Sequence, residues 1–132
     1  MIRCLSQYVE NKTAFVIGTD LFCGFRPSSA SARCVVVLDR TGFHPSFDLT
    51  DKKEWPVQFL TRALNYDDAQ EDAKTIVALF SGQSGIDLPV LASGEAYHIA
   101  VAEVLSGPYW LGQDQQGRHE FSTNMLLRMQ DQ

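Results

Sequence analysis

The stretch "GQDQQGRHEFSTNMLLRMQ", residues 112–130, decides the fold. From His119 onward, residues of one parity are mostly large and apolar, whereas residues of the other parity are mostly polar. The first set is His119, Phe121, Thr123, Met125, Leu127 and Met129, and the second is Glu120, Ser122, Asn124, Leu126 and Arg128. Such twofold alternation is typical of a β-strand. We therefore predict a final strand from His119 to Met129, entered through a turn at Gly117.

The same alternation bears on Arg118, His119 and Glu120, three consecutive polar residues that could suggest a reactive site. Side chains at successive strand positions point to opposite faces, so His119 and Glu120 are not expected to ligate one metal ion or to relay one proton. We interpret these residues as structural, with His119 at the rim of the core. A small cytosolic metal-dependent hydrolase that uses His119 and its acidic neighbours stays open as an alternative.

Apolar spacing and turn residues predict the remaining elements. The predicted helices are a first helix that ends near residues 11–13 and a second that is capped by Asn65 and closed by Gly82. The predicted strands are a bent strand or hairpin arm within 14–25, a strand over 34–38 covered on both faces, a strand over 56–64, a short strand after residue 85 and a strand over 97–105. A turn is expected at 93–95, and loops are expected over 39–55 and 107–117. These elements indicate an α+β fold with a mixed, mainly antiparallel sheet of about four to six strands packed against two helices.

The composition is that of one globular domain spanning residues 1–132, with 45% hydrophobic and 20% charged residues. Sixteen acidic residues against eleven basic ones give a net charge of -5, and no basic cluster favours sequence-specific nucleic-acid binding. The three cysteines show no C-x-x-C spacing and are expected to be reduced thiols. Neither a leader-like apolar segment nor a membrane-length apolar run is visible, which favours the cytosol and no membrane contact.

Signals of catalysis are weak. His44, His98 and His119 are scattered, and neither H-x-x-x-H nor G-x-S-x-G occurs. An acidic group lies at the start of the predicted second helix, where carboxylates stabilise the positive helix end. It comprises Asp67, Asp68, Glu71 and Asp72, and it lacks the glycine-centred spacing of a calcium loop. We expect no enzymatic activity, no catalytic residue, no cofactor and no metal site.

Several aromatic residues fall in segments interpreted as loops, where such side chains often anchor partners. They are Phe43, Phe47, Trp55, Tyr109 and Trp110. The alternative is that each packs beneath its own loop as a satellite of the core. Together with Arg118 they are the candidate residues for contacts with other subunits or partners, and the segments 39–55 and 107–117 are the expected contact loops.

Four segments resemble the minor capsid or tail terminator proteins of tailed bacteriophages. They are "GTDLFCGF" (18–25), "TGF" (41–43), "PVQFLTRALNYDDA" (56–69) and "GPYWLGQDQQGRHEFSTNMLLR" (107–128). The most specific part is the closing motif, a Pro followed by Gly-x-Asp and then by Gly-Arg-His-x-Phe-Ser-x-Asn. The resemblance implies an α/β fold with a mixed or antiparallel sheet, flanking helices, no catalysis, and assembly as a ring that is usually a hexamer.

By this resemblance the chain would be a structural virion protein of a phage or prophage, located in the tail or neck after assembly in the host cytoplasm. It would cap the head-proximal end of the tail tube, stop tube polymerisation and join the tail to the head. The implied partners are further copies of itself, the tail tube protein, and the head connector or a head-closure protein. A head-closure or other neck protein is the alternative. The acidic balance adds the hypothesis of a ring lumen lined by Asp and Glu, through which DNA passes without adhering.

Overall fold

One sheet and two helices make up the computed structural model, which describes residues 2–39, 44–45, 52–92 and 94–130. The elements are α1 (Ile2–Lys12), β1 (Leu21–Cys23), β2 (Cys34–Asp39), β3 (His44–Pro45), β4 (Lys52–Ala63), α2 (Tyr66–Phe80), β5 (Ser84–Asp87), β6 (His98–Gln113) and β7 (His119–Gln130). The strand order is β1-β2-β4-β7-β6-β5. Strand β3 is outside this order and pairs with β4. Only β1 and β2 pair in parallel among these strands. The predicted α+β fold with a mixed, mainly antiparallel sheet is confirmed.

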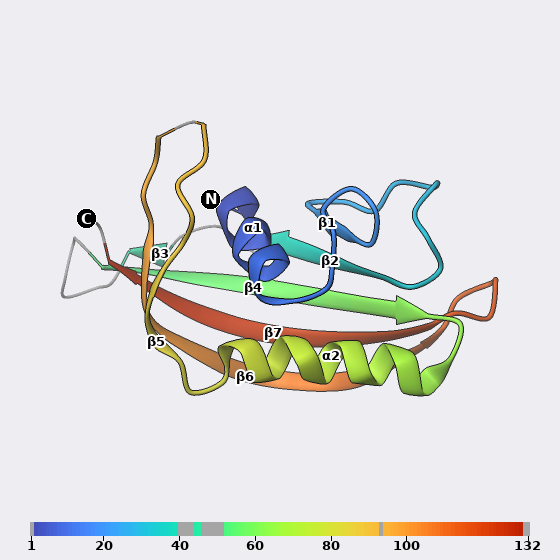
Figure 1. Ribbon diagram of the computed structural model, residues 1–132. Coiled ribbons are helices and arrows are strands. Elements are labelled where there is room, and N and C mark those ends of the chain that lie inside the picture. The colour runs from blue at the N-terminus through green and yellow to red at the C-terminus, as the bar shows by residue number, and fades with distance from the viewer. Residues whose placement is uncertain (1, 40–43, 46–51, 93, 131–132) are drawn as a thin grey trace.

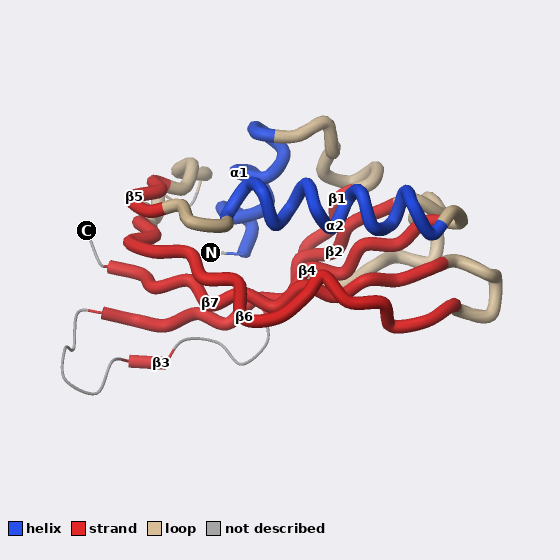
Figure 2. Tube along the Cα trace, turned by 90° about the horizontal axis from the view of Figure 1, so that it is seen from below, coloured by secondary structure: helices blue, strands red, loops and turns tan. Residues whose placement is uncertain are grey.

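Both helices lie on the same face of the sheet (Figures 1 and 2). In β4 the alternate residues Val57, Phe59, Thr61 and Ala63 are all buried, as the twofold pattern predicts. Helix α2 turns a buried stripe toward them, made of Ala69, Asp72, Ala73, Ile76 and Phe80. Helix α1 buries Leu5 and Val9 in the same core. The core therefore fills the layer between the helices and the sheet.

Helix α2 begins and ends where the sequence predicts. The Asn65 backbone is extended, and its side-chain oxygen accepts the backbone N–H of Asp67 at 2.8 Å. This contact satisfies one of the backbone donors that a helix start leaves without an intrahelical partner. At the other end Ser81 is the C-cap and Gly82 follows with a φ of +72°. Helix α1 likewise ends at Lys12, within the expected region.

Strand β4 begins at Lys52, which is four residues earlier than predicted. Its register with β7 is continuous from Lys52 opposite Gln130 to Ala63 opposite His119. The interpretation of 39–55 as one loop is therefore wrong at its ends, because long-range pairing with β7 extends the strand into a polar segment, and also at residues 44–45, where β3 pairs with β4. Trp55 lies in this strand with none of its surface exposed, and its indole Nε1 donates to Asp39 Oδ1 at 2.5 Å. Phe43 and Phe47 lie outside the described residues.

Strand β6 runs to Gln113, although the sequence predicts its end at residue 105. The prediction of a loop over 107–117 is thus wrong for most of that segment. Tyr109 and Trp110 belong to the strand, and only 114–118 form the turn to β7. The reason is that β6 shifts its register against β7 at four places, so its side chains lose the twofold alternation. Gly107 and Pro108, which look like turn residues in the sequence, lie at one of these shifts.

The remaining segments follow the expected order with smaller differences. Residues 14–25 contain a turn and the short strand β1, which pairs in parallel with β2 and so forms no hairpin with it. Strand β2 is buried from Cys34 to Val37, which confirms that both of its faces are covered. Between β5 and β6 the chain forms an arm that stands out from the body (Figure 1), with Leu88 buried at its base.

Candidate assembly interface

An aromatic cluster lies at the end of the sheet where α2 begins. It comprises Tyr66 of α2, Trp110 of β6, and His119 and Phe121 of β7. The Tyr66 ring lies 5.1 Å from the Phe121 ring and 5.5 Å from the His119 ring, measured between centroids. Trp110 lies opposite Phe121 in the β6–β7 register, and its Nε1 donates to His119 Nδ1 at 3.2 Å. The indole N–H can only donate, so His119 Nδ1 is the acceptor in this contact.

Glu120 points away from this cluster. Its Oε1 accepts from Arg26 Nη1 at 2.9 Å, whereas His119 contacts α2 on the helix-covered face. The prediction that His119 and Glu120 point to opposite faces is confirmed. In the part of the chain that the structure describes, no group of three or more His, Cys, Asp or Glu residues is placed to hold a metal ion. The geometry therefore does not bring His119 and an acidic neighbour together as a hydrolase would require.

Arg118 is engaged within the β6–β7 turn. Its Nε donates to Asp114 Oδ2 at 2.7 Å, and Asp114 Oδ1 also accepts the backbone N–H groups of Gln116 and Arg118. Hydrogen bonds to a carboxylate favour its charged form, and the pKa of Asp114 is lowered, chiefly by the backbone N–H of Arg118. The arginine is half-buried, so its first role is to hold the turn that carries the aromatic cluster.

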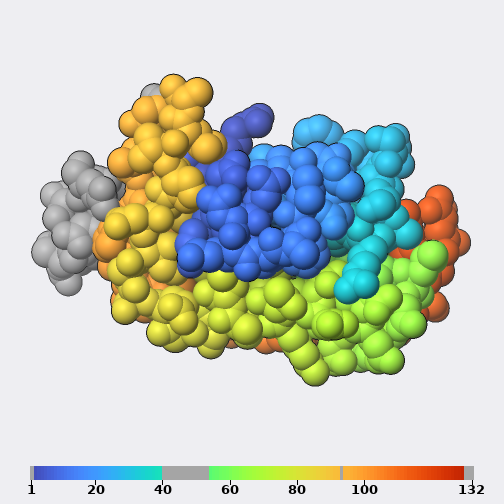
Figure 3. Space-filling model, in the orientation of Figure 1, coloured from blue at the N-terminus to red at the C-terminus, as the bar shows by residue number. Residues whose placement is uncertain are grey.

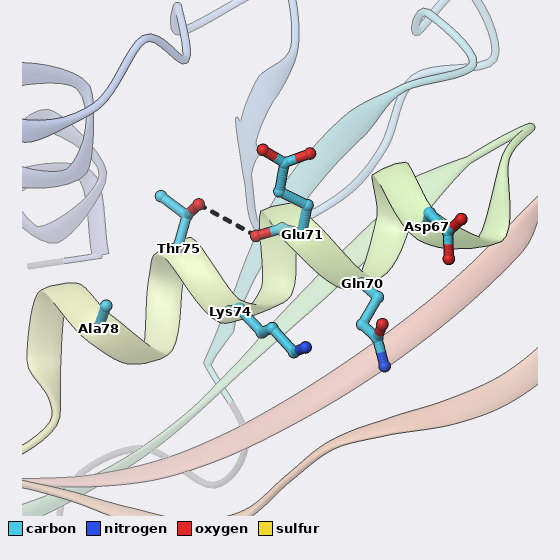
Figure 4. A pocket seen from close by; sticks show the side chains of 6 residues that line it. All are labelled: Asp67, Gln70, Glu71, Lys74, Thr75 and Ala78. Atoms are coloured by element: carbon cyan, nitrogen blue, oxygen red, sulfur yellow. Dashed lines mark hydrogen bonds between the residues drawn. The ribbon is translucent and has the colours of Figure 1, made fainter.

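In the acidic group at the start of α2, the buried carboxylate of Asp72 forms an ion pair with the half-exposed Arg33. Arg33 Nε and Nη2 reach the two oxygens of Asp72 at 2.9 Å each, a bidentate pair that raises the pKa of Arg33. On the outer side of the helix lies a shallow hollow of about 370 Å³, in which the side chains spread apart and do not converge (Figure 4). Its lining is Asp67, Gln70, Glu71, Lys74, Thr75 and Ala78. These contacts fit the structural interpretation of the acidic group.

The open edge of β6 carries a group of exposed apolar side chains. Strand β5 pairs with β6 only over 98–101, so the rest of β6 has a strand neighbour on one side alone. The exposed residues there are Leu105 (55%), Tyr109 (44%), Trp110 (51%) and Leu111 (50%), which we call the β6 edge patch. Pro108 and the register shifts interrupt the regular backbone donors and acceptors of this edge. The patch is thus suited to contacts through side chains more than to the addition of a strand.

The sequence identified only half of this patch. Tyr109 and Trp110 were candidate interface aromatics, with packing beneath their own loop as the alternative, and the structure places both at the surface, although in a strand. Leu105 and Leu111 were missed, since a leucine is expected in a core wherever the side-chain period is unclear. Trp55, unlike Tyr109 and Trp110, is fully buried and therefore offers no surface to a partner.

The cysteines and the lengths of the helices complete the description of the described residues. All three cysteines are free, and Cys4 and Cys34 are buried. Burial raises the pKa of the Cys34 thiol. Across the described residues, no helix combines the length and the apolar character that crossing a membrane requires.

The comparison with known protein families matches nearly the whole chain. A family profile described as bacteriophage tail terminator protein matches residues 8–131, which includes every strand of the sheet and helix α2. No curated protein matches the chain. The matched range includes the motif at the end of the chain, residues 107–128. The chain therefore belongs to the bacteriophage tail terminator family and is a structural protein of the phage tail.

Proposed function

We propose that the chain acts as a single domain that assembles into a ring, in the hexameric form usual for such proteins, at the head-proximal end of the tail tube. Family membership supports the tail role. The observation that carries the ring is the β6 edge patch, because four large apolar side chains are exposed on the part of β6 for which the described chain supplies no second strand neighbour. Exposed apolar surface often marks sites of protein association.

The β6 edge patch supplies the centre of the proposed subunit contact. Tyr109 and Trp110 are the aromatic anchors, and Arg118 lies at the adjoining turn. A stable contact buries on the order of 800 Å² on each partner, so further surface must join the patch. Phe43 and Phe47 remain candidates for that surface. Trp55 is left out of the proposal because it is buried.

In this role the ring stops tube polymerisation and offers its other side to the head connector or a head-closure protein. The partners are then further copies of the chain, the tube protein and the connector, and the work is mechanical, without catalysis or a cofactor. Assembly takes place in the host cytoplasm, before the ring becomes part of the neck of the virion. DNA passes through the lumen, which we propose to be lined with acidic side chains that do not retain a polyanion.

Tail length tests this proposal directly. Deletion of the gene from its phage should give tails of irregular and excessive length in negative-stain images. Complementation with Leu105→Gln and Leu111→Gln combined should fail to restore normal length, whereas Leu64→Gln should restore it. Leu64 is a matched control because it is 63% exposed but directly follows β4, a strand inside the sheet and not at either end of the strand order. Tails of normal length together with empty or leaking heads would show a head-closure protein instead.

A further inference from the structure

We infer that the hydrogen bond between Trp110 and His119 is a proton-sensitive switch. It orders Trp110 while His119 is neutral and releases Trp110 when His119 is protonated, so that acid weakens association through the β6 edge patch. The switch itself rests on geometry, whereas its effect on association rests on the proposed function. Trp110 belongs both to the aromatic cluster and to the β6 edge patch, so a change at His119 acts directly on the proposed contact surface.

The ring proton of neutral His119 has one possible position in this contact. Because Trp110 Nε1 can only donate, His119 Nδ1 must be the acceptor, and Nε2 then carries the proton. The neighbour of Nε2 is the side-chain amide of Gln113, with 3.2 Å between the two Nε2 atoms. An amide offers an acceptor oxygen as well as a donor nitrogen, so Gln113 can meet this proton with its oxygen. Neutral His119 thus joins two residues of β6 through one acceptor and one donor.

Protonation disrupts only one of these two contacts. An imidazolium carries a proton on both ring nitrogens, so Nε2 of His119 still donates toward Gln113. The proton on Nδ1, in contrast, meets the N–H of Trp110, and two donors do not form a hydrogen bond. The indole has no acceptor atom with which it could adapt. The loss therefore falls on Trp110.

The elements packed against His119 present mainly uncharged side chains to it. Tyr66 of α2 contacts the imidazole edge-on at 5.5 Å, and Ala63 of β4 and Gln113 of β6 lie opposite it in register. Asp67, the next residue of α2, lines the hollow on the outer side of that helix. Histidine is the side-chain type that ordinarily changes charge between about pH 5 and about pH 8. Protonation of the imidazole is therefore the event that acts on this cluster in that range.

The charged neighbours of His119 in the chain are engaged elsewhere. Arg118 pairs with Asp114 at 2.7 Å, and Glu120 pairs with Arg26 at 2.9 Å. Among the residues that the structure describes, no carboxylate forms an ion pair with His119. A proton gained by the ring is thus not matched by a new ion pair that would hold the cluster together.

Release of Trp110 changes the surface at one end of the molecule. In Figure 3 the green start of α2 lies there against the orange-red turn between β6 and β7. Trp110 is 51% exposed, so the freed indole can move into solvent. A side chain that is free before binding must be ordered in the contact, which should lower the association constant about fivefold.

Two variants separate the switch from other titrating groups. His119→Asn keeps an acceptor near the position of Nδ1 but cannot gain a proton. His98→Asn is the matched control, because His98 lies at the other end of β6 and contacts Asp87. Circular dichroism confirms that both variants fold. The local measurements are made in a background that lacks the proposed contact, Leu105→Gln combined with Leu111→Gln.

In this background, nitrogen-15 NMR locates the protons of His119, and acrylamide quenching reports the accessibility of Trp110, since Trp55 is fully buried. At about pH 8 we expect the proton of His119 on Nε2. On acidification to about pH 5.5 the quenching constant should rise, in the range where histidines titrate. The rise is at most about twofold, because Trp110 is already 51% exposed.

The two variants decide the cause of this rise. It should persist in His98→Asn and be absent in His119→Asn. A proton on Nδ1 of His119 at about pH 8 would overturn the inference without any variant. A rise of the same size in His119→Asn would also overturn it, because another group would then release the indole.

Analytical ultracentrifugation of proteins with an intact β6 edge patch measures the effect on association. From about pH 8 to about pH 5.5 the association constant should fall about fivefold more in the wild type and in His98→Asn than in His119→Asn. Equal falls in all three proteins, or a wild type that is monomeric at both pH values, would overturn the effect on association. The NMR and quenching results would still decide the local switch. Failure of the tail-length experiment, in contrast, would count against the proposed function.

Discussion

At the scale of single residues, Gly107 is the position of β6 least open to change. It has a φ of +96°, and an ideal Cβ built there would lie 3.1 Å from the Thr123 Cα and closer still to the Ser122 carbonyl oxygen. Gly107→Ala should therefore combine a left-handed backbone cost of about 1–2 kcal/mol with an overpacking cost of about 1–3 kcal/mol. We expect the free energy of unfolding to fall by more than about 2 kcal/mol in urea denaturation.

Gly117 offers a matched control for this change. It also has a positive φ, +77°, but an added Cβ would meet nothing within 4 Å. Gly117→Ala should therefore lose only the backbone term, about 1–2 kcal/mol. If both variants were destabilised equally, the close approach of β6 to β7 at Ser122 would not contribute, and the contact seen at Gly107 would be of no energetic importance.

At the scale of elements, the start of α2 depends on one side chain. Asn65 accepts the backbone N–H of Asp67, and two carboxylates follow in the first turn of the helix. Asn65→Ala removes the cap and should lower the free energy of unfolding by about 1 kcal/mol. Asn65→Asp keeps an acceptor and should cost much less. Urea denaturation of the two variants measures the difference, and equal stability of Asn65→Ala and the wild type would contradict the role of the cap.

The same scale shows why the sequence predicted some strands well and others poorly. Strands β4 and β7 pair in continuous register, so the alternation from Val57 to Ala63 and along β7 reports the buried face correctly. Strand β6 shifts register four times, and no local pattern remains from which its length or its exposed face could be read. Sequence patterns therefore predict an element well when its neighbours impose one regular period on it.

Candidate interface residues follow the same logic. Trp55 looked like a loop aromatic because polar residues precede it, but its burial results from pairing with β7 more than 70 residues later in the chain. Trp110 and Tyr109 were identified because large aromatics stood next to Gly and Pro. Leu105 and Leu111 carried no such signal, because the exposure of an aliphatic side chain depends on which strands end the sheet.

At the scale of the whole molecule, two ion pairs join segments that lie far apart in the sequence. Arg33, just before β2, holds Asp72 of α2 through two hydrogen bonds of 2.9 Å, and Arg26 Nη1 lies 2.9 Å from Glu120 Oε1 of β7. The side chain of Asp72 is 6% exposed and that of Arg33 is 48% exposed. The first pair therefore fixes α2 against the segment before β2, and its removal would leave a buried carboxylate without its ionic partner.

Arg33→Gln should lower the free energy of unfolding by about 1–3 kcal/mol, because a buried charged acceptor loses its charged donor. Urea denaturation measures the loss, and a double-mutant cycle with Asp72→Asn separates the pair from the other contacts of either residue. Lys74→Gln, on the outer side of the same helix, removes a charge of the same sign and serves as the control. A loss no larger than that of Lys74→Gln, or a coupling energy near zero, would show that the pair does not stabilise the fold.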